Sequence, residues 1–209
     1  MSNNDKIPYE DKRIGDFLAC SKGLLQNAVK KQGHILKHKI PYKTIGQLLI
    51  ENGDITREDW ETAIRKQRIF RLRSCPVFSS LSDTELAALS SSFVEVTVDM
   101  GEQFIVQDMP EPTLYILASG KVEVYRTEVD ETRTHIAYVE PPEPIGEMGY
   151  SSGGVRTASV RAVKTSILLR ANYKDLTHYF ENVPRVAFEF MRIVEARRQD
   201  TEEILKNPE

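Results

Sequence analysis

Two hydrophobic patterns divide the chain near residue 75. From about residue 92 onward, apolar and polar residues alternate in short runs, which is the period of half-buried β-strands. Turn-forming residues separate the runs, as in residues 108–112 and at Ser119-Gly120. Short strands at this spacing predict an antiparallel β-sandwich or roll. The expected strands lie at residues 93–98, 104–106, 114–117, 122–125, 134–139, 160–162 and 166–169.

Helices are expected on both sides of these strands. Ser82 and Glu85 have the spacing of a capping box, in which each side chain accepts a hydrogen bond from the backbone N–H of the other residue. Pro184, just after Asn182, marks a second helix start near the end of the chain. Helical spacing in that segment predicts one apolar face made of Ala187, Phe190, Met191 and Val194.

The first 73 residues contain two similar stretches and no alternating strands. Residues 13–32 and residues 44–67 each suggest a short helix, a turn bounded by glycine and a longer helix, with the first copy shortened. In the second copy, Thr56 and Asp59 can cap a helix, and Ile55 and Trp60 can form a hydrophobic staple. The sequence therefore predicts an α+β protein in which a small all-α module precedes the β-roll.

The composition is that of an ordinary globular protein, with 40% hydrophobic and 28% charged residues. No apolar run approaches the roughly 20 residues of a membrane span. The first residues lack the charged and then apolar layout of a secretion signal. Cys20 and Cys75 have neither metal nor redox spacing. We therefore expect a cytoplasmic protein with reduced thiols and no membrane span.

Charge is divided unevenly along the chain. Residues 1–75 carry 15 Lys and Arg against 9 Asp and Glu, whereas residues 76–209 carry 13 against 22. This division favours two separate modules with solvated faces, although a basic segment can also bind an acidic partner or nucleic acid. Nothing like a recognition helix follows the acidic part, so we expect no sequence-specific DNA binding. His34 and His38 are four residues apart, but neighbouring lysines oppose a metal there, and we expect none.

Residues 146–160 carry the most informative chemistry in the chain. They offer a carboxylate at Glu147, a guanidinium at Arg156 and a hydroxyl at Thr157 within a cluster of small residues. Such a turn can bring backbone N–H groups and an arginine to a phosphate, while the carboxylate accepts hydrogen bonds from a sugar. Because no nucleophile–base pair or carboxylate dyad lies nearby, we expect ligand binding and no enzymatic activity.

Residues 75–205 resemble the cyclic nucleotide-binding domain of catabolite activator protein and of the cyclic nucleotide-dependent kinases. The supporting strings are Cys75-Pro76-Val77-Phe78, Met100-Gly101-Glu102, Leu114–Val124, Gly146-Glu147-Met148-Gly149 and Arg156-Thr157-Ala158. The resemblance implies a β-roll, similar to a double-stranded jelly roll, with flanking helices. It also implies a non-enzymatic receptor for a cyclic mononucleotide, which would signal through an unknown effector protein.

The resemblance assigns a role to each cassette residue. It implies that Arg156 pairs with the exocyclic phosphate oxygens and that Glu147 accepts a hydrogen bond from the ribose 2′-hydroxyl. Gly146 and Met148 would offer backbone contacts, and Thr157 would offer its hydroxyl and N–H to the phosphate. Three apolar positions would line the base pocket, namely Val124, Ile136 and Ile145. A residue that caps the base is expected from the C-terminal helix or from a partner chain.

The choice of base depends on fewer residues. A hydroxyl at Thr157 is compatible with cyclic GMP and with cyclic AMP, and we favour cyclic AMP. Val155 stands where proline is common, and Asp108 stands where a turn glycine is usual, although aspartate tolerates unusual backbone angles. Tyr150 replaces an aliphatic residue, and we expect its ring in the core and its hydroxyl at the surface.

The N-terminal repeat resembles another family. Residues 44–67 are similar to the N-terminal module of type II secretion and type IV pilus ATPases, some of which bind cyclic di-GMP through tandem copies. Thr44 replaces an expected arginine, so a helical partner-docking module is favoured over cyclic di-GMP binding. We thus expect a loosely ordered tail at 1–12, a helical module at 13–73 and a nucleotide-binding domain at 75–205.

Two alternatives remain beside the receptor. One is a scaffold with a vestigial nucleotide pocket, and the other is a sensor that also binds cyclic di-GMP through its N-terminal module. The helix face through Ala187, Met191 and Val194 suits either a homodimer or packing on its own roll.

Overall fold

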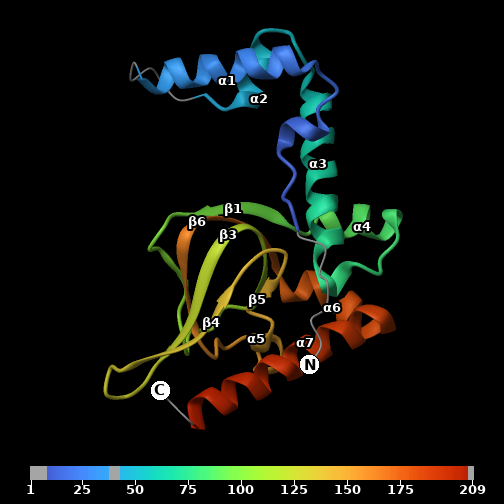
Figure 1. Cartoon of the computed structure of the whole chain (residues 1–209). Coiled ribbons are helices and arrows are strands. Elements are labelled where there is room, and N and C mark those ends of the chain that lie inside the picture. The colour runs from blue at the N-terminus through green and yellow to red at the C-terminus, as the bar shows by residue number, and fades with distance from the viewer. Residues whose placement is uncertain (1–8, 38–42, 207–209) are drawn as a thin grey trace. The chain divides into compact units, whose positions relative to one another are not determined.

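The computed structural model describes residues 9–37 and 43–206 of the 209-residue chain. These residues pack as two compact units (Figure 1). One unit is Lys12–Arg68, and the other takes in Ile69 onward with the described residues among the first eleven. The tail expected at residues 1–12 falls mostly on residues 1–8, which lie outside the described residues. The boundaries expected at 13–73 and 75–205 stay predictions.

The Lys12–Arg68 unit consists of short and long helices joined by turns. Thr56 caps the second long helix, since the Asp59 N–H donates to Thr56 Oγ1 at 3.0 Å and the Thr56 N–H donates to Asp59 Oδ2 at 2.9 Å. The predicted capping pair is therefore confirmed. The elements are η1 (Ile14–Phe17), α1 (Lys22–Lys37), α2 (Ile45–Glu51) and the first part of α3 (Arg57–Ser74).

One glycine in each repeat lets its two helices approach closely. Gly15 lies against the side chain of Leu25, and Gly46 lies against the indole ring of Trp60. A Cβ at Gly46 would come within 2.5 Å of two ring carbons of Trp60. Trp60 packs on the core of this unit, whose buried residues include Leu48, Leu49 and Ala63. Both stretches thus contain a glycine that lets two segments approach closely, and the internal repeat itself stays a prediction.

The other unit is built on six antiparallel strands. Their order is β1-β6-β3-β4, with β2 paired to β6 and β5 paired to β3. This arrangement confirms the predicted α+β fold, a jelly-roll-like antiparallel sheet with flanking helices. The strands are β1 (Val94–Val98), β2 (Gln103–Ile105), β3 (Thr113–Thr127), β4 (Arg133–Val139), β5 (Pro144–Ile145) and β6 (Ser159–Asn172).

Two of the strands are longer than the sequence pattern predicts. β3 runs through Ser119-Gly120, where a turn was expected, and β6 joins the two runs expected at 160–162 and 166–169. The register between β3 and β6 shifts around Ser119–Lys121, as it does at β-bulges. Gly120 has φ +99°, and a Cβ there would collide with Ser166. The glycine therefore bends the paired strand and does not end it.

Alternation along β3 supplies two separate cores. Leu114 and Ile116 point into a core shared with the helices, whereas Tyr115 and Leu117 point into the interior of the roll. Successive side chains of a strand point to opposite faces, so one strand can bury both of its faces. The helical core is closed by buried residues of α4 (Asp83–Ser90) and by residues of the two C-terminal helices, including Phe180, Val186 and Phe190.

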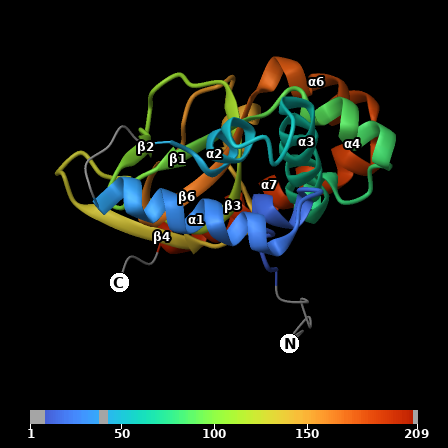
Figure 2. The same ribbon diagram turned by 90° about the horizontal axis from the view of Figure 1, so that it is seen from above.

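Helices α4, α6 and α7 pack against the sheet of this unit, and a short 3-10 helix, η2 (Pro76–Phe78), precedes α4. The capping box predicted at α4 (Asp83–Ser90) is confirmed, because the Ser82 N–H donates to Glu85 Oε2 at 2.8 Å and the Glu85 N–H donates to Ser82 Oγ at 3.3 Å. The sequence pattern missed α6 (Tyr173–Asn182) but predicted the start of α7 (Pro184–Lys206). Figures 1 and 2 place α4 and α6 at one end of the roll, away from the β3–β4 hairpin.

The buried face of α7 differs from the predicted one. Phe190 and Val194 are buried as expected, but Ala187 is only half-buried and Met191 is exposed. Val186 and Ile193 complete the buried stripe. The stripe is rotated because the core contacts of α7 select among several apolar positions at helical spacing. Its packing on the chain's own roll is therefore established, and a homodimer through this helix stays a prediction.

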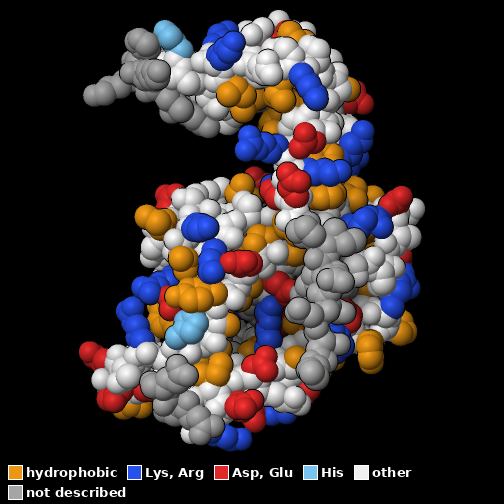
Figure 3. Space-filling model, in the orientation of Figure 1, with side chains coloured by type: hydrophobic (Ala, Val, Ile, Leu, Met, Phe, Trp, Pro, Cys, Tyr) orange, Lys and Arg blue, Asp and Glu red, His pale blue; other side chains and the backbone are white. Residues whose placement is uncertain are grey.

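Surface charge is mixed where it is visible. Over the β-roll in Figure 3, Lys and Arg side chains are interspersed with Asp and Glu side chains. No helix within residues 9–37 and 43–206 is long and apolar enough to cross a membrane.

The close contact at Gly46 generates a prediction. Replacing Gly46 by Ala should destabilise the Lys12–Arg68 unit by about 1–3 kcal/mol, because the new methyl overpacks the Trp60 ring. Gly33 is the matched control, since it lies within α1 and a Cβ there would meet no atom within 4 Å. Gly33→Ala should be neutral or stabilise by up to about 1 kcal/mol. Thermal unfolding followed by circular dichroism would measure both, and equal transitions for the two variants would contradict this packing.

Candidate functional site

A pocket of about 570 Å³ opens between the β-roll and α7. All eight residues predicted to contact a ligand line it, namely Val124, Ile136, Ile145, Gly146, Glu147, Met148, Arg156 and Thr157. The structure therefore brings the predicted residues together, while their individual roles stay predictions.

Glycine conformation places the two charged residues of the cassette. Gly146, directly after β5, has φ +83°, and a Cβ there would collide with Nη1 of Arg156. The chain then forms α5 (Met148–Ser151) and turns back through Gly153 and Gly154, which have φ +66° and +91°. This double reversal returns Arg156 to the carbonyl of Gly146. The positive φ values and the close approach explain why the predicted cassette needs its small residues.

The guanidinium of Arg156 is almost fully buried and bonded on several sides. Arg156 as a whole is 1% exposed. Nε donates to Glu111 Oε2 at 3.2 Å, and Nη2 donates to Thr113 Oγ1 at 2.7 Å. Nη1 donates to the Gly146 carbonyl at 3.1 Å and to Tyr173 Oη at 3.2 Å. These bonds use four of the five N–H groups of the guanidinium.

The pKa shifts of the groups around Arg156 favour the protonation states that bind it. Burial alone would raise the pKa of Glu111, but hydrogen bonds from Tyr115 and Arg156 outweigh burial and lower it. Burial raises the pKa of Tyr173 to about 12, so its hydroxyl stays protonated and donates to the Gly146 carbonyl. Glu111, Thr113 and Tyr173 were not predicted as site residues. Glu111 falls within the turn predicted at 108–112, but a predicted turn gives no information about contact with a distant arginine.

A second arginine, Arg197 of α7, holds the other cassette charge. Glu147 is 3% exposed, and its Oε2 lies 3.0 Å from Nη1 of Arg197. Nη2 of Arg197 lies 3.1 Å from Glu143 Oε2, and Nη1 donates to the Pro144 carbonyl at 2.6 Å. Burial opposes the charge on Arg197, but the carboxylates of Glu147 and Glu143 outweigh it and raise the pKa of Arg197. The C-terminal helix is thereby tied to the cassette by an ion-pair cluster.

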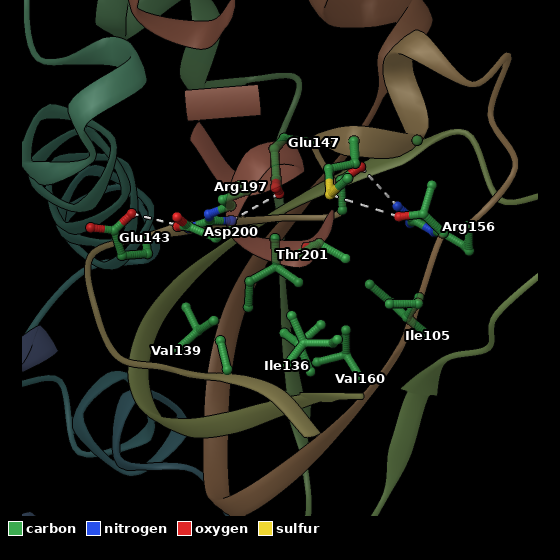
Figure 4. Close-up of a pocket in the computed structure, with 18 of the residues that line it drawn as sticks. Ile105, Ile136, Val139, Glu143, Glu147, Arg156, Val160, Arg197, Asp200 and Thr201 are labelled. Carbon is green, nitrogen blue, oxygen red and sulfur yellow. Dashed lines mark hydrogen bonds and ion pairs between the residues drawn. The ribbon is translucent and has the colours of Figure 1, made fainter. Parts of the chain in front are cut away.

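Figure 4 shows how the pocket is divided. Glu147, Arg156 and Arg197 lie toward one side of it, and Ile136, Val139 and Val160 lie toward the other. Helix α7 also contributes residues to the pocket lining that the sequence pattern did not identify. These are Arg197, Asp200, Thr201, Glu203 and Ile204. This lining is consistent with a base-capping residue from the C-terminal helix, which stays a prediction, and Thr201 supplies a hydroxyl there.

Two departures from the family pattern behave as the sequence predicts. Asp108 adopts φ +63°, and its N–H donates to the Arg156 carbonyl at 2.9 Å, so an aspartate fills the glycine-like turn position. The Tyr150 ring packs edge-on against Phe180 and Phe190, while its hydroxyl donates to Glu181 at 2.9 Å. Thr157 donates to the sulfur of Met148 at 3.8 Å and is otherwise placed to meet a ligand.

The site combines a polar end with an apolar end. A guanidinium and a carboxylate suit a phosphate and a sugar, and the apolar strand residues suit a flat base. Within residues 9–37 and 43–206, no group of three or more His, Cys, Asp or Glu side chains is arranged to hold a metal ion. The arrangement therefore favours recognition of an anionic, partly aromatic small molecule.

Comparison with known proteins points to one family. Residues 95–183 match the family model described as the cyclic nucleotide-binding domain. The "Cyclic AMP receptor protein" of Thermus thermophilus is 28% identical over 131 residues, which cover 63% of this chain and 61% of that protein. The chain thus spans about three fifths of the length of this curated relative.

Solved structures agree with that match. The crystal structure of Thermus thermophilus catabolite activator protein has a TM-score of 0.55 at 28% identity, covering 63% of this chain and 62% of that one. The N-terminal domain of a transcriptional regulator from Streptomyces coelicolor A3(2) is 33% identical with a TM-score of 0.51, covering 65% of this chain and 94% of that one.

The ion pair between Glu111 and Arg156 predicts a pH dependence of stability. A carboxyl group whose pKa is lower in the folded protein stabilises fully above its unfolded pKa, about 4.3 for Glu, and this stabilisation is lost as pH falls through the folded pKa. Glu111→Gln should therefore cost about 1–3 kcal/mol at pH 7 and progressively less below about pH 4. Urea unfolding at several pH values would measure this.

The control for that experiment is Glu131→Gln, at an exposed position in the β3–β4 turn. It should leave stability within about 0.5 kcal/mol at every pH. A penalty for Glu111→Gln that stays constant down to pH 3 would rule out the ionised pair as its source.

Two adjacent arginines of α7 give a second test. Arg197→Met leaves the buried Glu147 without its cation and should lower stability by about 1–3 kcal/mol. Arg198 is exposed and pairs along its own helix, with Glu195 and Glu202, so Arg198→Met should change stability by less than about 0.5 kcal/mol. Denaturant unfolding of both variants would show the difference, and equal losses would argue against the Arg197 cluster.

Proposed function

Because the chain belongs to the cyclic nucleotide-binding domain family through residues 95–183, we propose that its pocket binds a cyclic mononucleotide. One observation carries this proposal. Glu147 and Arg156 both lie at one side of a pocket of about 570 Å³, and the opposite side is apolar. The protein is then a non-enzymatic receptor, in which binding alone is the signal.

Each residue of the pocket has a role in this proposal. Four of the five guanidinium N–H groups of Arg156 bond to the protein, and the fifth donates to the cyclic phosphate. Thr157 adds a hydroxyl. Glu147 accepts a hydrogen bond from the ribose 2′-hydroxyl, and the backbone of Gly146 and Met148 contacts the sugar phosphate. The base lies against Val124, Ile136 and Ile145, all of which line the pocket.

Helix α7 is the element that responds to the ligand. Arg197 engages Oε2 of Glu147, so a ribose hydroxyl has to share that carboxylate with α7 or take it over. Thr201 and Ile204 of the same helix line the pocket and would contact the base. A ligand shifts the position of α7 only as far as it binds the two positions with different affinity.

The identity of the purine is a finer proposal. Cyclic AMP is named for the Thermus relative and is favoured by the sequence analysis, so it is the first ligand to test. Cyclic GMP is the second, because the Thr157 hydroxyl can serve either base.

We propose that the output is contact with an effector protein. Phe188 and Met191 on α7 are 72% and 51% exposed, and exposed apolar residues on a helix that borders the pocket suit a protein partner. A homodimer through this helix is one form of such contact. Because the chain spans about three fifths of the curated relative, the output of that whole protein is not carried over.

Two further readings stay open to experiment. A scaffold with a vestigial pocket would keep its cellular role after loss of nucleotide binding. Cyclic di-GMP binding by the Lys12–Arg68 unit would make the protein a dual sensor, and titration of the full chain with cyclic di-GMP tests that reading.

Isothermal titration of the ligand-free protein with cyclic AMP and cyclic GMP tests the receptor directly. Arg156→Lys keeps the charge but loses the planar fork, so it should weaken binding by roughly 10- to 100-fold. Arg161→Lys is the control, because Arg161 is an exposed residue of β6 paired with Glu123, and it should change affinity by less than about two-fold. Lack of binding to the parent protein at tens of micromolar would refute the proposal.

A further inference from the structure

Helix α1 (Lys22–Lys37) presents a basic face that its own sequence does not neutralise. Its 16 residues include four lysines and one histidine but no Asp or Glu, so no ion pair can form along this helix. The arginines of α7, by contrast, pair with glutamates one turn away. Lys22, Lys30 and Lys31 are exposed, and Lys31 donates to the neutral side chain of Asn52 at 3.0 Å. The positive charge of α1 is therefore open to an acidic group from outside the helix.

The same face has room for an apolar side chain. Its residues 26, 29, 30 and 33 have the spacing i, i+3, i+4 and i+7, which on a helix surrounds one position as the hole of a knobs-into-holes contact. Val29 is 49% exposed, and a Cβ at Gly33 would meet no atom within 4 Å. A glycine inside a helix costs about 1 kcal/mol relative to alanine, and packing among the described residues does not offset that cost at Gly33. The open glycine leaves space for a side chain of another molecule.

The turn between β3 and β4 has the complementary properties. Glu128, Asp130 and Glu131 are exposed there, and Val129 between them is fully exposed. The turn is held by its own backbone, since the Glu128 N–H donates to the Thr132 carbonyl at 2.9 Å and the Glu131 N–H donates to the Glu128 carbonyl at 3.0 Å. It therefore presents one apolar side chain among three carboxylates, and binding requires little further ordering of its backbone.

We propose that the basic face of α1 binds the β3–β4 turn of a second copy of the chain. Val129 then lies over Gly33 and beside Val29, and the carboxylates of the turn lie toward Lys22 and Lys30. A copy of the chain is the occupant that the sequence favours, because one chain supplies both a basic surface and an acidic, apolar-tipped turn that matches it. The contact joins two different surfaces, as in a heterologous interface. It goes beyond the proposed function, since it requires no nucleotide.

Self-association of the unaltered, ligand-free protein is the first test. Sedimentation velocity at about 1–200 µM should show association that grows with concentration, with a micromolar dissociation constant. Because ion pairs between exposed groups are screened by salt, raising the ionic strength from about 0.05 M to 0.5 M should weaken the association at least ten-fold. Association that is unchanged or strengthened by salt would contradict a contact between charged surfaces.

Single substitutions then locate the contact. Lys30→Glu and Glu131→Lys should each weaken the association by roughly ten-fold or more, because like charges then face each other. Lys66→Glu is the matched control, since Lys66 is an exposed lysine of α3 in the same unit, and it should keep the dissociation constant within about three-fold.

Gly33→Ala separates binding from folding. The new methyl group occupies the position over which Val129 lies, so the association should weaken several-fold although the variant is at least as stable as the parent protein. A Gly33→Ala protein that associates as tightly as the parent would show that the open glycine does not receive Val129.

A mixture of two variants tests whether the two surfaces bind each other. Lys30→Glu keeps an intact turn, and Glu131→Lys keeps an intact α1 face. Each variant alone should stay monomeric at about 20 µM, whereas an equimolar mixture should form heterodimers, because the turn of the first fits the α1 face of the second. A mixture that stays monomeric overturns the pairing.

The remaining outcomes separate this contact from a dimer through α7. Phe188→Ser removes an exposed apolar side chain of α7 and should change the association by less than about two-fold. If Phe188→Ser abolishes the association and Lys30→Glu does not, the copies meet through α7 and the proposed contact is wrong. If the parent protein is monomeric at about 200 µM in low salt, a second copy is not the occupant. Circular dichroism checks that each variant is folded, and the salt dependence of the parent protein decides for any variant that is not.

Discussion

The buried guanidinium of Arg156 is the interaction on which the site depends. Removing a cation from water costs several kcal/mol unless its donors find partners. Here those partners come from the start of β3, from the turn after β5 and from the start of α6, through Thr113, the Gly146 carbonyl and Tyr173. These segments must converge for Arg156 to be buried, so folding itself places the arginine beside the pocket. A ligand then binds a preorganised group, so little conformational entropy of this side chain is lost on binding.

Alternation along β3 makes this convergence possible. The strand buries Leu114 and Ile116 toward the helices and Tyr115 and Leu117 toward the interior of the roll. The same short stretch pairs with β5, because Tyr115 lies opposite Ile145 and Ile116 opposite Pro144. The cassette that follows Ile145 is thus anchored to a strand that is fixed on both faces. Helix α7, by contrast, approaches the pocket with charged residues. Its ion pairs there are easier to exchange for contacts with a ligand than the packed contacts of β3.

Local chemistry was predictable from the sequence, and long-range pairing was not. The capping pairs Ser82–Glu85 and Thr56–Asp59 depend on residues three positions apart, and both are confirmed. Positive φ at Asp108 follows from its own side chain. The turn predicted at Gly120 was wrong because Ser166, on another strand, decides what that glycine does. Family resemblance supplied Glu147 and Arg156, but no sequence pattern points to Glu111, 45 residues before its arginine, or to Arg197, 54 residues after Glu143. The predicted face of α7 was only partly right for a similar reason, since the core buries Phe190 and Val194 but leaves Met191 exposed.

The electrostatic state of the pocket decides what a ligand has to supply. Glu147 is already neutralised by Arg197, and Arg156 by Glu111, so a nucleotide gains little from charge attraction alone. Selective binding of a nucleotide therefore has to come from directed hydrogen bonds. Its effect on the protein has to come from replacing protein–protein bonds by protein–ligand bonds. If the ribose takes Glu147, Arg197 keeps only Glu143 and the Pro144 carbonyl, and the balance that holds α7 changes. In the proposed receptor, displacement of one ion pair by one hydroxyl would therefore link occupancy of the pocket to the position of the helix. The same helix carries the exposed Phe188 and Met191, so a change at the carboxylate reaches a surface that a partner could recognise.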